Sequence, residues 1–454
     1  MPYSSLLEKY NQPVPRYTSY PTVPFWTEGL DRDAWQSLFT HEYDEADAGN
    51  GISLYIHLPF CESLCTYCGC NKKITTRHAA EKPYMEAILA EWKLYGKLMK
   101  RKPVIRELHL GGGTPTFFSP QNLVSLLTRL FEGAVIHPQH EFSFEGHPNN
   151  TTREHLQALY DLGFRRVSFG VQDHNPEVQR VINRIQPLEN VQRVITEARE
   201  IGYDSVNTDL IYGLPLQTLA SMEETIRQTI ALRPDRIAFY SYAHVPWTSR
   251  AQRLFDEHDL PDADLKMQLY RLSKKLFQEA GYQDIGMDHF ALPHDDLYLA
   301  KQNGTLHRNF MGYTLHPTNI LLGLGVSAIS DAGAGYAQNE KTLHEYYNAV
   351  QSGILPVVKG YLLSEEDKTF RSYILDISCR GKTHFRKKDL GLLQTWCFPK
   401  LDLLQDDGLL TYNKGGLHIT ETGAHFIRNI CYAFDLHVHR KKTDTATPLF
   451  SKAI

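Results

Sequence analysis

Short apolar runs alternate with longer amphipathic segments between residues 51 and 250. The runs are rich in β-branched and aromatic residues, as buried strands are. They recur at intervals of roughly 25 to 50 residues. The segments between them, such as 80–99 and 189–201, are long enough for amphipathic helices. The predicted strands are residues 53–58, 107–110, 141–145, 166–169, 206–210 and 236–240.

This order of elements predicts an α/β fold in which parallel strands are joined by crossover helices. In an α/β barrel the active groups follow the C-terminal ends of the strands. A doubly wound open sheet gives the same order of elements, so the pattern alone does not decide whether the sheet closes.

The sequence patterns of the two ends of the chain differ from that of its middle. Residues 1–50 show no clear period and carry Pro13 and Pro15, which predicts an arm laid on the surface. From about residue 360 the pattern is mainly helical, with a helix start at 364–367 and a hairpin at 409–412 and 416–419. We therefore predict three domains, at 1–50, 51–359 and 360–454.

The composition narrows the class of protein. The chain has 454 residues, 42% of them hydrophobic, which is enough for a large core. A formal charge of -4 gives no net attraction to nucleic acid, so we expect no nucleic-acid partner. No apolar run reaches the length of a membrane span, and no basic-then-apolar leader opens the chain. We expect a soluble cytoplasmic protein without a membrane partner.

Four of the seven cysteines lie in one loop, residues 61–70, directly after the first predicted strand. A Cys-x3-Cys-x2-Cys spacing can place three thiolates around one iron-sulfur cluster and leave one iron free for a substrate or cofactor. Structural zinc is an alternative, with His57 or Cys70 as the fourth ligand. A disulfide is disfavoured because neither a leader nor an even cysteine count points to an oxidising compartment.

A glycine-rich run, residues 111–116, follows the second predicted strand. Glycines let the backbone approach a ligand, and its free amide and carbonyl groups can grip an ammonium or carboxylate. A phosphate-binding loop is excluded because neither Gly-Lys-Ser/Thr nor the Rossmann spacing is present. An ordinary tight turn remains the alternative.

Polar residues stand at or beyond the ends of the later strands. Glu145 ends the third strand, and a charge that closes an apolar run needs a partner such as a cationic sulfonium or an amine. Singly, each of these residues fits a structural role as well. Together they lie where one elongated ligand would touch them all: Glu145, Gln172, Arg184, Asp209 and Ala243.

The cysteine spacing, with aromatic Tyr67 before the third cysteine, resembles the radical S-adenosylmethionine enzymes. The sequence Tyr-Ile-His-Leu-Pro-Phe at 55–60 and the extra Cys70 are similar to one branch of them, the oxygen-independent coproporphyrinogen III oxidases. The resemblance implies a partial six-unit barrel. It also implies that a [4Fe-4S] cluster is bound by Cys61, Cys65 and Cys68. Two S-adenosylmethionine molecules are implied, with contacts at Tyr55, Tyr67, Gly112, Gly113, Thr114, Glu145, Gln172, Arg184, Asp209, Ala243 and Ile329.

The same resemblance implies a reaction in heme biosynthesis. A 5'-deoxyadenosyl radical would drive the anaerobic decarboxylation of two propionates of coproporphyrinogen III to vinyl groups, giving protoporphyrinogen IX. It assigns no catalytic side chain. An electron donor such as a flavodoxin or ferredoxin is implied, and we expect a monomer. The alternatives within the superfamily are a heme-trafficking protein and a heme-opening methyltransferase.

Substrate contacts and departures from the family pattern are less defined. Arg16 in the arm is a candidate for a propionate contact or for plain packing. Asp288, His289, His307 and Arg308 form a polar group that a substrate with four propionates could use. Met311 stands where some family members have Gln, and Gly-His-Pro at 146–148 stands where members often have Val-Asp-Pro.

Overall fold

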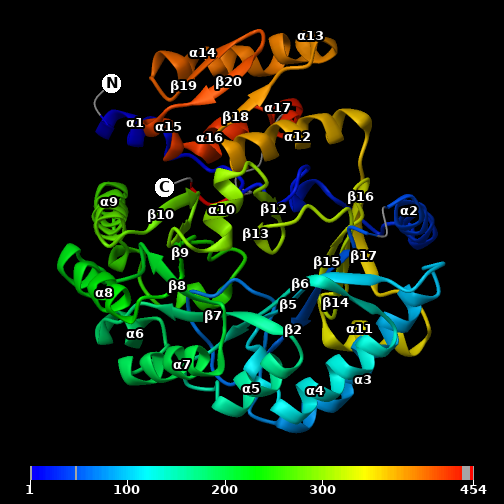
Figure 1. Cartoon of the computed structure of the whole chain (residues 1–454). Coiled ribbons are helices and arrows are strands. Elements are labelled where there is room, and N and C mark those ends of the chain that lie inside the picture. The colour runs from blue at the N-terminus through cyan, green and yellow to red at the C-terminus, as the bar shows by residue number, and fades with distance from the viewer. Residues whose placement is uncertain (1–2, 47–48, 442–449, 453–454) are drawn as a thin grey trace.

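The fold is built on one 13-stranded sheet with helices packed along it (Figure 1). The computed structural model describes residues 3–46, 49–441 and 450–452. Six neighbouring strands of the sheet are parallel and follow chain order, and each contains one predicted strand. They are β2 (Ile52–Leu58), β5 (Val104–Gly112), β6 (Val135–Gly146), β7 (Phe164–Gln172), β8 (Ser205–Tyr212) and β9 (Arg236–Ser241). The predicted α/β class is confirmed.

The sheet is open. Parallel strand β14 (Leu321–Leu324) extends it beyond β2, and antiparallel β11 (His289–Ala291) extends it beyond β9. Its two ends remain apart within the described residues, so the six parallel units form a partial barrel. The antiparallel margins are β10 (Gln283–Gly286), β15 (Ile329–Asp331), β16 (Gly335–Asn339), β17 (Val357–Leu362) and β1 (Thr27–Glu28).

Crossover helices cover the outside of the parallel strands (Figure 1). α4 shows why: its buried residues Leu123, Leu126, Leu127 and Leu130 recur at helical spacing, and Ser119 caps its first turn. The predicted helices at 80–99 and 189–201 are confirmed as α3 (Glu81–Gly96) and α7 (Leu188–Ile201). The others are α4 (Pro120–Glu132), α5 (Arg153–Asp161), α6 (Pro176–Val181), α8 (Leu219–Leu232) and α9 (Ala263–Glu279). Two further helices belong to the antiparallel margins, α10 (Asp296–Gln302) after β11 and α11 (Leu343–Gln351) between β16 and β17.

The inner face of the parallel strands is polar. Tyr55 pairs in register with His109, and His109 with Ser143, while Glu145 pairs with Ser168 on the next strand. Because successive side chains alternate between faces, the intervening residues of these strands, such as Leu108, Leu110, Phe142 and Phe144, are buried on the helix side. The barrel therefore has an apolar exterior under its helices and a polar interior.

The N-terminal arm is more regular than its sequence suggests. Two helices lie in it, α1 (Tyr3–Tyr10) and α2 (Arg32–Glu45). In α2 the buried Trp35, Phe39 and Tyr43 recur every four residues, a helical signal that spans barely three turns.

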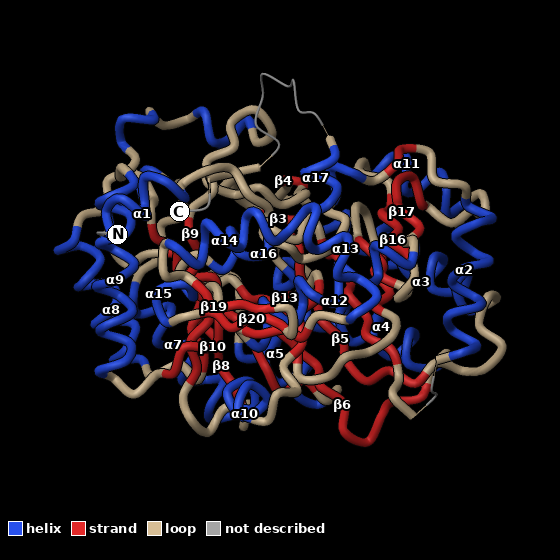
Figure 2. Tube along the Cα trace, turned by 90° about the horizontal axis from the view of Figure 1, so that it is seen from above, coloured by secondary structure: helices blue, strands red, loops and turns tan. Residues whose placement is uncertain are grey.

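The C-terminal part packs across the open side of the barrel, and the view from above shows α14 (Phe398–Asp406), α16 (Ile427–Tyr432) and the strands β19 and β20 in front of the parallel strands (Figures 1 and 2). The predicted helix start is confirmed, since the Ser364 side chain caps α12 (Glu365–Arg380). The predicted hairpin is confirmed as β19 (Leu410–Asn413) and β20 (Gly416–Ile419). The remaining elements are β18 (Lys382–His384), α13 (Leu390–Leu392), α15 (Glu421–Ala424) and α17 (Leu436–Arg440).

The two boundaries between the three predicted domains stay predictions. The boundary at 359/360 falls inside β17, whose partner strands include β1 from the arm. Residues 1–2, 47–48, 442–449 and 453–454 of the predicted outer domains lie outside the described residues. No helix in the described part of the chain is both long and apolar enough to cross a membrane.

Candidate cofactor site

The cysteine loop is fastened at the C-terminal end of the first barrel strand. After β2, β3 (Phe60–Cys61) pairs in parallel with β4 (Lys73–Ile74), which closes the loop on itself. The backbone N–H of Thr66 donates to the Ile182 carbonyl at 3.0 Å, and its hydroxyl donates to the Val181 carbonyl at 3.2 Å. These bonds hold the loop through its backbone and the Thr66 side chain. The thiols of Cys61, Cys65 and Cys68 form no disulfide.

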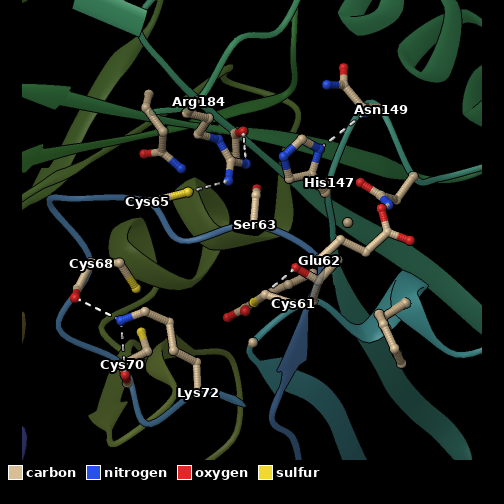
Figure 3. A pocket seen from close by; sticks show the side chains of 18 of the residues that line it. Cys61, Glu62, Ser63, Cys65, Cys68, Cys70, Lys72, His147, Asn149 and Arg184 are labelled. Atoms are coloured by element: carbon tan, nitrogen blue, oxygen red, sulfur yellow. Dashed lines mark hydrogen bonds between the residues drawn. The ribbon is translucent and has the colours of Figure 1, made fainter. Parts of the chain in front are cut away.

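Hydrogen-bond donors stand at the cysteine sulfurs (Figure 3). Thr114 Oγ1 donates to Cys61 Sγ at 3.3 Å, and Arg184 Nη1 donates to Cys65 Sγ at 3.6 Å. The neighbouring Cys70 thiol and the Lys72 ammonium lower the pKa of Cys68 below its ordinary value. Donors of this kind stabilise thiolates, which are the form that binds iron.

Among the described residues, no group of three or more His, Cys, Asp or Glu side chains is placed to hold one metal ion. Cys61, Cys65 and Cys68 border a common cavity. Three cysteines around one cavity fit the ligand set of an iron-sulfur cluster, in which each cysteine binds a separate iron.

This main cavity, of about 480 Å³, lies between the cysteine loop and the ends of strands β5 to β9. It brings together all three cysteines of the motif and eight of the eleven predicted S-adenosylmethionine contacts. Those eight are Tyr67, Gly112, Gly113, Thr114, Glu145, Gln172, Arg184 and Asp209. Their positions agree with the prediction, while their roles stay predicted.

A second cavity, of about 240 Å³, adjoins the main one at Glu145. Tyr55, Met311 and Ile329 line it, so two further predicted contacts and the departure at 311 meet there. Ala243 lines neither cavity.

One side chain connects Ala243 to the cysteine loop. Gln252 Nε2 donates to the carbonyls of Ala243 at 3.2 Å and of Tyr67 at 2.8 Å. Ala243 is therefore tied to the loop through its backbone.

Glu145 supplies negative charge where the two cavities meet. Its carboxylate accepts the Gly112 N–H at 3.2 Å and lies 3.4 Å from His109 Nε2. Burial alone would raise the pKa of Glu145, but His109 and the Gly112 amide outweigh it and hold that pKa below its ordinary value. Burial and the nearby Glu145 charge raise the pKa of Asp209 to about 7. The site thus holds one fixed anion and one carboxyl that titrates near neutrality.

Two glycines are required by close approach. Gly112 has φ +114°, and a Cβ there would lie 2.6 Å from the His57 ring. A Cβ at Gly170 would lie 2.7 Å from Gln172 Nε2 and 2.8 Å from Arg184 Nη2. Larger residues at either position would displace the groups that line the main cavity.

Two lining residues were not singled out from the sequence, since Tyr240 and Lys72 border the main cavity. Tyr240 stands near a strand end, so its position was an available signal. His147, noted from the sequence only as part of a departure from the family pattern, borders the same cavity just after β6. Burial and the nearby Arg184 charge lower the pKa of His147 to about 2, which makes its ring neutral.

The comparisons with known proteins agree with this site. Residues 55–229 match the model of the radical SAM superfamily, which defines the class of the barrel. The chain is 39% identical to the oxygen-independent coproporphyrinogen III oxidase of Synechocystis over 99% of this chain and 98% of that protein. It is 37% identical to the protein of the same name from Pseudomonas aeruginosa, over 96% of each. The chain belongs to the family of oxygen-independent coproporphyrinogen III oxidases.

A solved structure supports the fold as well. The coproporphyrinogen III oxidase from Escherichia coli, described as a radical SAM enzyme, superimposes with a TM-score of 0.87 at 36% identity. The match covers 94% of this chain and all of that one. The predicted family resemblance and the radical SAM type of partial barrel are therefore confirmed.

Proposed function

We propose that this chain converts coproporphyrinogen III to protoporphyrinogen IX by oxidative decarboxylation of two propionates without oxygen, in heme biosynthesis. One observation carries the proposal: three free cysteines and the charged Glu145 border one cavity at the strand ends of a barrel from this family. The relatives' names supply the reaction, and the cavity supplies a place for its cofactors.

Cys61, Cys65 and Cys68 would hold a [4Fe-4S] cluster, which leaves one iron for S-adenosylmethionine. When bound, these groups supply the electron and the hydrogen-abstracting radical, which protein side chains cannot provide. Two adjoining cavities that share Glu145 support two molecules of S-adenosylmethionine.

The chain's own residues would bind and orient these groups. Glu145 offers a carboxylate to a cationic ligand, and the residues around Gly112 offer backbone at close range. Thr114 and Arg184 donate to cysteine sulfurs and would tune the cluster. The C-terminal elements across the open side of the barrel would exclude water from the radical chemistry (Figure 2).

We also propose an electron donor, a cellular compartment and an oligomeric state. The reaction needs an electron donor, for which a small redox protein such as a flavodoxin or ferredoxin is suited. We propose that the chain acts in the cytoplasm as a monomer, without nucleic acid or membrane. The free cysteines support a reducing compartment, and the net charge of -4 supports the absence of nucleic acid.

One anaerobic assay tests the function. Protein with reconstituted cluster is mixed with reductant, S-adenosylmethionine and coproporphyrinogen III. We expect carbon dioxide and, after oxidation, a porphyrin with two vinyl groups. Methylated linear tetrapyrroles, or no turnover by protein with an intact cluster, would contradict the proposal.

A further inference from the structure

Three cations from distant parts of the chain meet at the barrel mouth. Arg16 Nη2 donates to the Ser241 carbonyl at 2.6 Å, and Lys266 Nζ donates to the next carbonyl, that of Tyr242, at 2.8 Å. Arg428 Nε donates to the Pro15 carbonyl at 3.2 Å, directly before Arg16. The arm, α9 and α16 thus deliver positive charge to the end of β9.

Positive charge exceeds negative charge around Lys266. Besides burial, the charges that most lower the pKa of Lys266 are those of Arg16, Arg428 and Lys452, all cations. Burial, together with these cations, lowers the pKa of Lys266 to about 7. A carboxylate, Asp288, lies 3.8 Å from Arg16. An anion bound here would relieve repulsion that the protein otherwise sustains.

A fourth cation lies in the same region without a hydrogen-bond partner for two of its nitrogens. Arg308 is only 6% exposed, and its Nε and Nη1 atoms have no partner among the described residues. Its guanidinium stacks 4.9 Å from the Tyr313 ring centre. Unpaired donors on a buried guanidinium are costly, so an anion that accepted hydrogen bonds from them would stabilise the protein.

Tyr240 connects this region to the cofactor site. It lines the main cavity, and it precedes Ser241, whose carbonyl holds Arg16. Burial raises the pKa of Tyr240. The charges that also shift this pKa are those of Asp209 in the main cavity and of Asp288, Arg308 and Arg16 in the cationic region. A substrate held by the cations would therefore place its other end next to the main cavity.

We propose that Arg16, Lys266 and Arg428, with Arg308 beside them, bind the carboxylates of the substrate that are not reacting. This inference rests on the proposed function, in which the substrate has four propionates and one reacts at a time. The remaining propionates need cations to replace their water, and a guanidinium or ammonium supplies charge-assisted hydrogen bonds. The alternative is that these cations only tie the arm to the barrel.

Binding of coproporphyrin III, a stable fluorescent tetracarboxylate, separates the two roles. In Lys266→Met, loss of one charge-assisted contact should weaken binding by about 10- to 100-fold. Lys266→Arg should restore most of it. The matched control is Lys275→Met, on the same helix, because the Lys275 side chain is 73% exposed and pairs with Glu279. The control should bind as the wild type does.

Stability gives a readout that a purely structural role would move in the opposite direction. Removing an ammonium crowded by other cations should leave the urea midpoint unchanged or raise it, whereas loss of a structural tie would lower it. If Lys266→Met does not fold, Arg16→Met takes its place, with the same expected loss of affinity.

The outcomes separate this inference from the proposed function. A wild-type chain that neither binds coproporphyrin III nor converts coproporphyrinogen III contradicts the function itself. A wild-type chain that does both, while Lys266→Met and Arg16→Met bind as tightly as it does, contradicts only the carboxylate site.

Discussion

Glu91 is a buried carboxylate that ties α3 to the strands beside the second cavity. It is 0% exposed and accepts three hydrogen bonds, from Gly325 N at 2.8 Å, Asn339 Nδ2 at 2.6 Å and the Tyr346 hydroxyl at 2.7 Å. Gly325 opens the turn that leads to Ile329 of the second cavity. We predict that Glu91→Ala destabilises the chain strongly and that Glu91→Gln does so mildly.

The magnitude follows from the three donors. Glu91→Ala leaves the Gly325 amide and the Tyr346 hydroxyl buried without this acceptor, and it leaves Asn339 Nδ2 with the Gly325 carbonyl alone, at 2.8 Å. Each lost hydrogen bond should cost about 1–3 kcal/mol. The alanine variant also loses the cost of burying a carboxylate, which offsets part of the lost hydrogen-bond energy. The net loss of stability should therefore be about 3–6 kcal/mol. Glu91→Gln keeps the shape and one acceptor oxygen, so its loss should be about 1–2 kcal/mol.

The pH dependence gives a second, independent test. Burial raises the pKa of Glu91 from 4.5 to about 7. A raised carboxyl pKa contributes stability that is present below the unfolded value and is lost as pH rises through the folded value. Glutamine does not titrate, so the stability of wild type relative to Glu91→Gln should fall by about 2–3 kcal/mol between about pH 5 and pH 8.

Urea unfolding followed by circular dichroism, under anaerobic conditions at both pH values, measures these differences. A Glu91→Ala variant within about 1 kcal/mol of wild type would refute the three-bond argument. A difference between wild type and Glu91→Gln that stays constant with pH would refute the raised pKa.

Three further predictions concern the cluster and the barrel. Alanine at any of the three motif cysteines should abolish the iron-sulfur absorbance, whereas Cys70→Ala should retain it. Iron and sulfide analysis of anaerobically prepared protein measures the cluster content of each variant. Thr114→Val removes the hydroxyl 3.3 Å from the Cys61 sulfur and should make the cluster potential more negative, measured by redox titration with an unchanged iron content as control. Asp295→Asn breaks a fully buried pair, in which Arg236 Nε donates at 2.7 Å, and should cost about 3–5 kcal/mol in urea unfolding; a loss near zero would contradict the pairing.

The six barrel strands could be predicted because each is a short apolar run that must be covered by the next helix. Residues 107–110 and 141–145 show this, since Leu108, Leu110, Phe142 and Phe144 alternate with polar residues on the inner face. The antiparallel margins, such as β15 and β16, were not predicted, because three- to five-residue strands carry too little periodicity. Helix α2 was missed for a similar reason, as three aromatic residues were its only regular signal.

The part of the cofactor site that depends on local sequence and family resemblance could be predicted. The cysteine loop and the residues at the strand ends, such as Glu145 and Asp209, share one cavity as expected. The meeting of Arg16, Lys266 and Arg428 could not be predicted, because it depends on how the arm and the C-terminal helices fold across the open side of the barrel. Long-range packing of this kind leaves no periodic trace in the sequence.

The proposed function depends on three cysteines that hold an iron-sulfur cluster with one iron open to S-adenosylmethionine. Electron paramagnetic resonance of the reduced, anaerobically prepared protein, with and without S-adenosylmethionine, tests this arrangement. We expect a [4Fe-4S] signal that changes shape when S-adenosylmethionine is added. A protein without such a signal, or with a signal that S-adenosylmethionine leaves unchanged, would contradict it.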